Sequence, residues 1–415
     1  MLKPSDPRSP EAQAERSWFD LLPWLFILLG CVMRVLWPLD MEWKYDEQWM
    51  FDKAQAIANG RTPWPWIGMA SGVGLRNPGL SIWPFALIAH VTEDPVLATQ
   101  LVQWINVLGV CGYALWVHKT WQPADRALGL WGTALYAVSP LSVLFSRKLW
   151  AQDLLIVFVL PWLWGQRARK RAWGAGLWGL CGALLGQVHM SGFFAAAALF
   201  AVTLWMDRGR FHVRAWLVGS VLGALPLLPW LAFLLSPEAK SAGHGSFSLQ
   251  FFTEALRHAW GLGLEYPVGR AYRQLLRGPE LAGVATHLAA AARYGLLALL
   301  VLAVVLRVRE GLRTKLPEPV LTYAGCVLVA GLLLCAARVH MFAHYLIVFG
   351  PMLHIAAVWT LLSRRWAVLA LCSLQAFLTA CFLVFIHVQG GAPNADYGKT
   401  YRVQTAEERQ FQPRD

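Results

Sequence analysis

Two adjacent carboxylates, Asp46 and Glu47, lie a few residues after the first long apolar stretch of the chain. A carboxylate can act as a general base, and this pair is well placed to meet a substrate whose lipid tail lies in a bilayer. The same residues also suit the start of a helix, where Asp46 would be the N-cap and Glu47 would complement the helix dipole. The sequence leaves both interpretations open.

A second charged group, Arg147, Lys148 and Asp153, lies between two later apolar stretches. Arg147 and Asp153 are six positions apart, so they do not share a helical face and each needs another partner. Charges that face the interior of a membrane bundle are costly and usually functional, so we predict a functional role for Asp153. The basic pair either binds substrate or extends to lipid headgroups, and the sequence does not choose between Arg147 and Lys148.

Arg76 and Asn77 precede Pro78 at the start of a short apolar segment, residues 79–92. A proline near the first turn and the exposed amides of a helix start favour anion binding, so we predict that this segment contacts a phosphate. A plain turn is the alternative.

Several polar residues interrupt the later apolar stretches. His189 is either a hydrogen-bonded core residue or part of a polar substrate pocket. Arg338, His340, His344 and Tyr345 form a cluster, in which the two histidines share a face if the segment is helical. This spacing can bind a metal ion, but no third ligand is visible, so we interpret the cluster as a phosphate-binding group.

These residues must be positioned by membrane helices, because the 415-residue chain is 57% hydrophobic and 14% charged. We predict an all-α polytopic membrane protein, with its spanning unit in residues 1–388 and about 11 transmembrane helices. The predicted spans are about 18–38, 97–117, 127–145, 150–166, 173–188, 190–206, 214–235, 292–307, 319–337, 343–362 and 366–388.

The basic run from Arg167 to Arg171 predicts a cytoplasmic loop. Alternating the spans from this loop places the other short basic clusters on the same side, with a cytoplasmic N-terminus and an outer C-terminal tail. The net charge of +12 is explained by these loops, so we predict contacts with membrane lipids and no nucleic-acid partner.

Two large loops are predicted on the outer face. The first, residues 39–96, holds the acidic pair, an amphipathic helix over 47–58 and an interfacial helix over 79–92. On the 47–58 helix, the pattern places Glu47 and Gln55 on the polar face. The second loop, residues 236–291, contains a stretch from Ser241 to Ser246 expected to be flexible and an amphipathic piece near 250–260, and we predict that it acts as a lid.

The C-terminal tail, residues 389–415, is rich in turn-forming residues. Two alternatives stay open for it: the tail folds back over the site, or it is a disordered end.

Taken in order, these features resemble the GT-C superfamily of polyprenyl-phosphate-sugar-dependent glycosyltransferases, most closely its bacterial protein O-mannosyltransferase and aminoarabinose transferase branch. The likeness covers most of the chain, from the acidic pair after the first span to the basic-Tyr motif near the end of the bundle. Two positions depart from the pattern of this family. Asn77-Pro78 stands where Lys-Pro is common, and His344-Tyr345 stands where Arg-Tyr is usual.

The resemblance implies an enzyme of the bacterial cytoplasmic membrane with its active site on the outer, periplasmic face. It implies inverting transfer of a sugar from a polyprenyl-phosphate carrier to a lipid, glycan or protein acceptor, with Asp46 as the base. The candidate phosphate ligands are Arg76, Arg147 or Lys148, Arg338 and His344. No cofactor is predicted, although some members of the superfamily use a divalent ion.

Two other functions fit a protein with many spans. A transporter or flippase for lipid-linked sugars predicts polar residues in mid-membrane along a path, whereas here the polar residues crowd one face. A non-catalytic scaffold for envelope-polymer synthesis predicts that loss of Asp46 and Asp153 is tolerated.

Overall fold

Long apolar helices make up most of the structure, a computed structural model that describes residues 10–71, 75–236, 239, 247–310 and 316–411. The α-helices are α1 (Pro10–Val35), α2 (Tyr45–Ala58), α3 (Trp83–Ala89), α4 (Pro95–Thr120), α5 (Pro123–Val138), α6 (Pro140–Leu144), α7 (Ile156–Arg167), α8 (Ala172–Val188), α9 (Ser191–Asp207), α10 (Val213–Ala224), α11 (Leu228–Leu234), α12 (Gln250–Ala259), α13 (Glu265–Val268), α14 (Tyr272–Arg277), α15 (Leu288–Glu310), α16 (Glu318–Ala336), α17 (Gly350–Leu361), α18 (Arg365–Gln389) and α19 (Tyr401–Phe411). The 3-10 helices are η1 (Pro38–Asp40), η2 (Gly79–Ser81), η3 (Ala151–Leu154), η4 (Leu225–Leu227), η5 (Gly269–Ala271) and η7 (Ala343–Phe349). The strands form three antiparallel pairs: β1 (Ile67–Ala70) with β2 (Arg76–Pro78), β3 (Glu280–Leu281) with β4 (Val284–Ala285), and β5 (Gly391–Ala392) with β6 (Gly398–Lys399).

Six helical segments in the described part of the chain are long and apolar enough to cross a membrane, so the predicted all-α polytopic membrane fold is confirmed. They are Pro95–Thr120, Val213–Leu234, Leu288–Glu310, Glu318–Ala336, Ala343–Leu361 and Arg365–Gln389. Each of the eleven predicted spans overlaps one helix or a run of consecutive helices. The number of membrane crossings stays a prediction.

Helix starts and close helix pairs follow from local sequence. Asp94 caps α4, because its carboxylate accepts a hydrogen bond of 2.7 Å from the Val96 amide, and Pro95 occupies the first turn. Helices α8 and α10 pack closely because glycines face each other. A Cβ atom on Gly219 would lie only 2.0 Å from the carbonyl oxygen of Gly176.

Residues 39–96, the first of the two predicted outer loops, contain a short β-hairpin that the sequence did not predict. Arg76–Pro78 is strand β2, in which Pro78 pairs with Ile67 of β1. The apolar segment that follows is helical as predicted, in η2 and α3, but it begins after the strand, so the prediction that Arg76 and Asn77 open this helix is wrong. A Cβ atom on Gly79 would lie 2.0 Å from the Pro65 carbonyl oxygen, so this close approach requires glycine.

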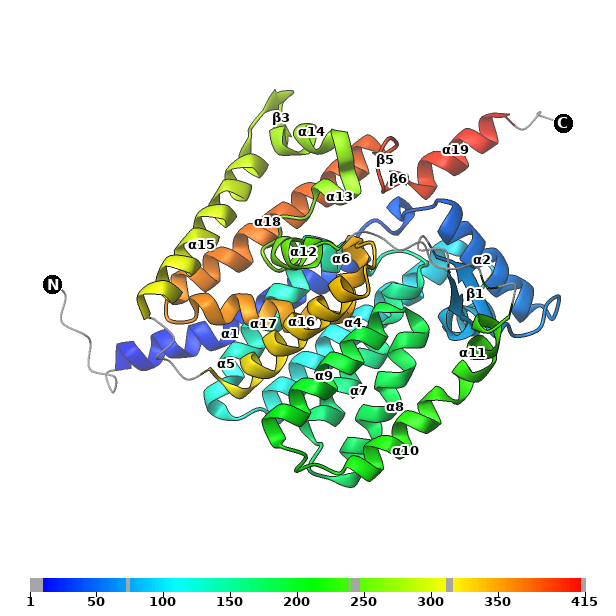
Figure 1. The fold of residues 1–415 in the computed structure, drawn as a ribbon. Helices are drawn as coiled ribbons and strands as arrows, with labels where there is room; N and C mark the ends of the chain where they lie inside the picture. The colour runs from blue at the N-terminus through cyan, green and yellow to red at the C-terminus, as the bar shows by residue number, and fades with distance from the viewer. Residues whose placement is uncertain (1–9, 72–74, 237–238, 240–246, 311–315, 412–415) are drawn as a thin grey trace.

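The C-terminal tail folds back over the first loop, so of the two alternatives the folded one is observed. Hairpin β5–β6 and α19 lie at the same end of the bundle as α2, away from the start of α1 (Figure 1). The Tyr401 amide donates a hydrogen bond of 3.0 Å to the Met41 carbonyl. The Tyr397 hydroxyl donates to the Asp40 carbonyl, and Arg402 Nε lies 3.0 Å from the Asp40 carboxylate. These contacts fix the tail beside α2.

Residues 236–291, the second predicted outer loop, include the amphipathic helix predicted near 250–260. Helix α12 buries Phe251 and Ala255 against the bundle. The predicted flexible stretch from Ser241 to Ser246 lies outside the described residues. The lid role of this loop stays a prediction.

Candidate active site

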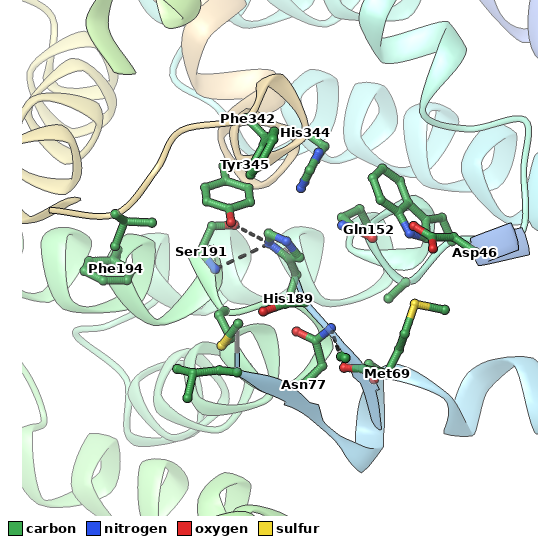
Figure 2. Close-up of a pocket in the computed structure, with 18 of the residues that line it drawn as sticks. Asp46, Met69, Asn77, Gln152, His189, Ser191, Phe194, Phe342, His344 and Tyr345 are labelled. Carbon is green, nitrogen blue, oxygen red and sulfur yellow. Dashed lines mark hydrogen bonds between the residues drawn. The ribbon is translucent and has the colours of Figure 1, made fainter. Parts of the chain in front are cut away.

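A cavity of about 420 Å³ lies where α2, hairpin β1–β2, the turn between α8 and α9, and the segment before α17 meet (Figure 2). These elements are far apart in the sequence, so the fold gathers residues from most of the chain at one place. The polar and aromatic lining includes Lys44, Asp46, Asn77, Trp150, Gln152, His189, Ser191, Tyr266, Arg338, Phe342, His344, Tyr345 and Asp396.

Asp46 lines this cavity and is half-buried. Helix α2 begins at Tyr45 with Lys44 as its N-cap, so the prediction that Asp46 is the N-cap is wrong. Figure 2 shows Asp46 on the same side of the cavity as Gln152. Its carboxylate makes no hydrogen bond or ion pair with any described residue. An unpaired carboxylate at a cavity wall is free to accept a proton from a bound hydroxyl.

Glu47 occupies a different environment from its neighbour. Its side chain is fully buried, and one oxygen accepts a hydrogen bond of 3.1 Å from the Lys44 amide at the start of α2. Burial and the nearby Glu42 carboxylate raise the pKa of Glu47 to about 7, against the opposing effect of Lys148 and Lys44. The predicted polar face of α2 is wrong at Glu47 and Gln55, since both are buried. The Gln55 amide is satisfied by donating to the Thr92 carbonyl at 2.7 Å.

Lys148 holds the buried acids together. Its Nζ lies 2.8 Å from the Glu42 carboxylate and 3.6 Å from the Glu47 carboxylate, and 4.2 Å from the centre of the Trp150 ring. Burial alone would lower the pKa of Lys148, but Glu42 and Glu47 outweigh it and raise this pKa well above its usual value. The lysine is therefore charged and fixed.

Arg147 has a different role from Lys148, so the structure distinguishes the two basic residues between which the sequence did not choose. Its guanidinium is buried and donates to the carbonyls of Met33, Arg34 and Trp37 at 2.7, 3.0 and 3.2 Å. It thereby satisfies carbonyl groups at the end of α1. Arg147 does not line the cavity, so it is not placed to contact a substrate phosphate there.

Asp153 is also buried and lies behind the cavity wall. Its carboxylate accepts a hydrogen bond of 3.1 Å from the Lys148 amide, and its carbonyl accepts one of 2.7 Å from the Asn106 side chain. These bonds fix the turn that carries Trp150 and Gln152 into the cavity. The geometry thus gives Asp153 a positioning role.

Lys44 and Asp396 are site residues that the sequence did not identify. Lys44 Nζ contacts the Glu42 carboxylate and lies 3.6 Å from the Asp396 carboxylate, which comes from the C-terminal tail. Burial lowers the pKa of Lys44, but Glu42 and Asp396 raise it overall, against the charge of Lys148. Lys44 could have been identified from the sequence, because Glu42 and Lys44 lie next to the acidic pair. Asp396 could not, because its place in the site depends on the path of the C-terminal tail.

The opposite wall carries His189, Arg338, His344 and Tyr345. His189 Nδ1 lies 2.7 Å from the Ser191 hydroxyl, and its ring centre is 5.5 Å from that of His344 and 5.1 Å from that of Tyr345. Burial lowers the pKa of His189 to about 3, so this ring is neutral. Arg338 is exposed, and its guanidinium has no ion pair within the described structure, so it is available to an anion.

Besides Arg147 and Lys148, two further predicted phosphate ligands do not line the cavity. Arg76 is exposed and does not line it, although the neighbouring Asn77 does. His340 also lies outside the lining, and the 3-10 helix η7 begins only at Ala343, so the helical segment in which His340 and His344 would share a face does not form.

A metal site needs several converging ligands. Among the residues that the structure describes, no group of three or more histidine, cysteine, aspartate or glutamate side chains has a geometry that could hold a metal ion.

Comparison with known proteins gives a fold-level match. No protein-family model matches the chain, and no curated protein matches it. The structure is similar to a crystal structure of ArnT from Cupriavidus metallidurans in the apo state, with a TM-score of 0.52 and 14% sequence identity. The match covers 90% of this chain and 65% of the ArnT chain. The likeness shows that the two chains share a fold, in agreement with the predicted all-α polytopic bundle.

Proposed function

We propose that this protein is an integral membrane glycosyltransferase that transfers a sugar from a polyprenyl-phosphate carrier to a hydroxyl group of a cell-envelope acceptor. The observation that carries the proposal is the unpaired Asp46 carboxylate in a cavity that also holds the cations Lys44 and Arg338. The ArnT-like fold and the GT-C resemblance of the sequence support it. We place the enzyme in a bacterial cytoplasmic membrane, with this cavity on the outer face.

Asp46 is the general base of the proposed reaction. It takes the proton of the acceptor hydroxyl while the hydroxyl oxygen forms a bond to the anomeric carbon of the donor sugar. The bond from that carbon to the phosphate oxygen breaks, and its electron pair leaves with the polyprenyl phosphate. A single displacement of this kind inverts the configuration at the anomeric carbon.

The leaving phosphate gains negative charge, so it needs cations in a site with little water. Arg338 supplies a guanidinium with no other ion pair in the described structure, and Lys44 supplies a second positive charge from the other side of the cavity. Lys148, held by Glu42 and Glu47, fixes the acidic side of the site and does not bind the phosphate.

The test is donor turnover by the purified full-length protein in lipid nanodiscs, measured as release of polyprenyl phosphate from a panel of polyprenyl-phosphate sugars. Asp46→Asn should lower turnover at least about 100-fold, because a positioned general base contributes on the order of 100- to 10,000-fold. The matched control is Asp52→Asn, an exposed acid of the same helix that does not line the cavity.

Wild-type-like turnover of Asp46→Asn would contradict the base assignment. Failure of the wild-type protein to release polyprenyl phosphate from any donor in the panel would contradict the transferase proposal itself.

A further inference from the structure

A second hollow of about 910 Å³ lies beside the cavity, between the start of α2 and the C-terminal tail. We call it the tail groove, and its lining includes Trp43, Lys44, Tyr45, Gln48, Gln404 and Glu408. One wall belongs to the loop after the first helix, and the other belongs to residues about 360 positions later, at the start of α19.

The tail groove and the cavity meet at α2. Lys44 lines both of them. Tyr45 lines the tail groove, and the next residue, Asp46, lines the cavity. A ligand that extends from the tail groove along Lys44 would therefore enter the cavity that holds the proposed base.

The side chains of the tail groove suit a sugar. Tyr45 is 73% exposed and has no aromatic ring packed on it among the described residues. Aromatic rings with a polar tip combine apolar contact with hydrogen bonding, as a sugar ring requires. Gln48 and Glu408 have side chains without a hydrogen-bond partner in the described part of the chain, and they can bond to hydroxyl groups.

The charge of the tail groove favours a neutral ligand. Lys399 is paired with Glu407 at 2.7 Å, and Lys44 is paired with Glu42 and Asp396. Glu408 is then the lining charge that has no ion pair among the described residues, and it would repel an anionic ligand.

The tail groove is preformed, because its two walls are tied together. The Gln404 amide donates to the Trp43 carbonyl, and the Trp43 ring packs edge-on against Tyr401 at 5.3 Å. The tail is also anchored at Asp40 by Arg402. A ligand would not have to order the tail before it binds.

We propose that the tail groove is the acceptor subsite and that the acceptor presents a neutral carbohydrate unit there. Naming this ligand the acceptor rests on the proposed function. With its sugar on Tyr45, the acceptor places a hydroxyl group at Asp46.

The test is saturation-transfer NMR on the full-length protein in nanodiscs, with the neutral trisaccharides of glucose, mannose and N-acetylglucosamine as probes. At least one trisaccharide should give a signal, and Tyr45→Ala should reduce it at least about fivefold. The matched control is Tyr294→Ala, since Tyr294 is 63% exposed on α15 outside the tail groove. Glu408→Gln, at an exposed position, should weaken binding about two- to fivefold.

Absence of binding by all three trisaccharides would overturn the proposal. It would also be overturned by binding that Tyr45→Ala and Glu408→Gln leave unchanged, or by preferential binding of a Ser/Thr-rich peptide at Tyr45. Failure of the proposed function appears separately, as no donor turnover by a protein that still binds the sugar through Tyr45.

Discussion

Two ion-pair clusters lie near opposite ends of α7, and they differ in whether they border the cavity. At the end of α7, Arg169 binds both oxygens of Asp207, at 2.5 and 3.0 Å, and one oxygen of Glu318 at 3.1 Å. At the start of α7, Lys148 lies between Glu42 and Glu47, and Lys44 lies between Glu42 and Asp396. Only the second cluster borders the cavity that holds Asp46.

This difference shows that a buried ion pair alone does not indicate an active site. The Arg169 cluster joins the ends of α7, α9 and α16, and Arg167 also lies 3.6 Å from Glu318, so its two acids have two cations. The Lys148 cluster has two cations for three acids and lies behind a cavity-lining carboxylate that has no partner among the described residues. Buried groups with such an excess of one charge are found more often at functional sites than elsewhere.

Removing the central cation of each cluster should have the largest effects. Lys148→Met leaves the Glu42 and Glu47 carboxylates buried without their common partner, and breaking such a pair costs about 3–5 kcal/mol. Arg169→Met should cost about half as much, because Glu318 is 47% exposed and water can solvate it. The measurement is thermal unfolding of both variants in one detergent.

Equal losses in melting temperature, or a larger loss for Arg169→Met, would contradict this ordering. Donor turnover sharpens the comparison, since only Lys148→Met should abolish it in the protein that remains folded.

Substitution of Arg338, a cavity-lining cation without an ion pair among the described residues, should have the next largest effect. Arg338→Ala removes a charge-assisted contact to the donor phosphate, which should raise the KM for donor roughly tenfold. Arg76→Ala is the matched control, because Arg76 is also exposed but does not line the cavity. A larger KM increase for Arg76→Ala would restore the sequence-based assignment of Arg76 and contradict the geometry.

The sequence predicted the helices well because apolar length and proline positions are local signals. The interfacial helix, α2 and α12 were all found in this way. Hairpin β1–β2 was missed because strands of 3 or 4 residues carry too little pattern. The prediction that Glu47 lies on the polar face of α2 was wrong, because Glu47 is buried through its ion pair with Lys148, about 100 residues away.

The site was predicted in part, because some of its residues also give a local signal in the sequence. Asp46, His189, Arg338, His344 and Tyr345 do line one cavity, as their polarity amid apolar stretches suggested. The choice between neighbours such as Arg147 and Lys148 depends on the direction of each side chain, which three-dimensional packing decides. The contribution of Asp396 depends on the path of the tail, for which the sequence left two alternatives.

The tail's contribution to the Lys148 cluster should be smaller than that of Arg338. Lys44 and Asp396 are 33% and 34% exposed, and an ion pair at such exposure is worth about 0.2–1 kcal/mol. Asp396→Asn should therefore lower kcat about two- to fivefold with little change in the KM for donor, because Lys44 loses a positioning partner. Glu310→Gln, which breaks a similarly exposed pair with Arg307 outside the cavity and the tail groove, should leave kcat unchanged. An equal loss in both variants would contradict the role of Asp396.

The smallest effect concerns the pH dependence of stability at Glu47. Its pKa is about 7 in the folded protein and near 4.5 in an unfolded chain. Between pH 4.5 and 7, the unfolded state has lost this proton and the folded state retains it, so the free energy of unfolding falls as pH rises through that window.

Glu47→Gln keeps the hydrogen-bond acceptor for the Lys44 amide and removes the titration. The fall in melting temperature from pH 5 to pH 8 should then be smaller than in the wild type, by roughly 2 °C. Asp207→Asn changes only the Arg169 cluster, so it should leave the part of the pH slope that Glu47 contributes intact. If Glu47→Gln instead left the fall from pH 5 to pH 8 unchanged, Glu47 would be ionised in both states over this range, and the acids around Lys148 would be as well paired as those around Arg169.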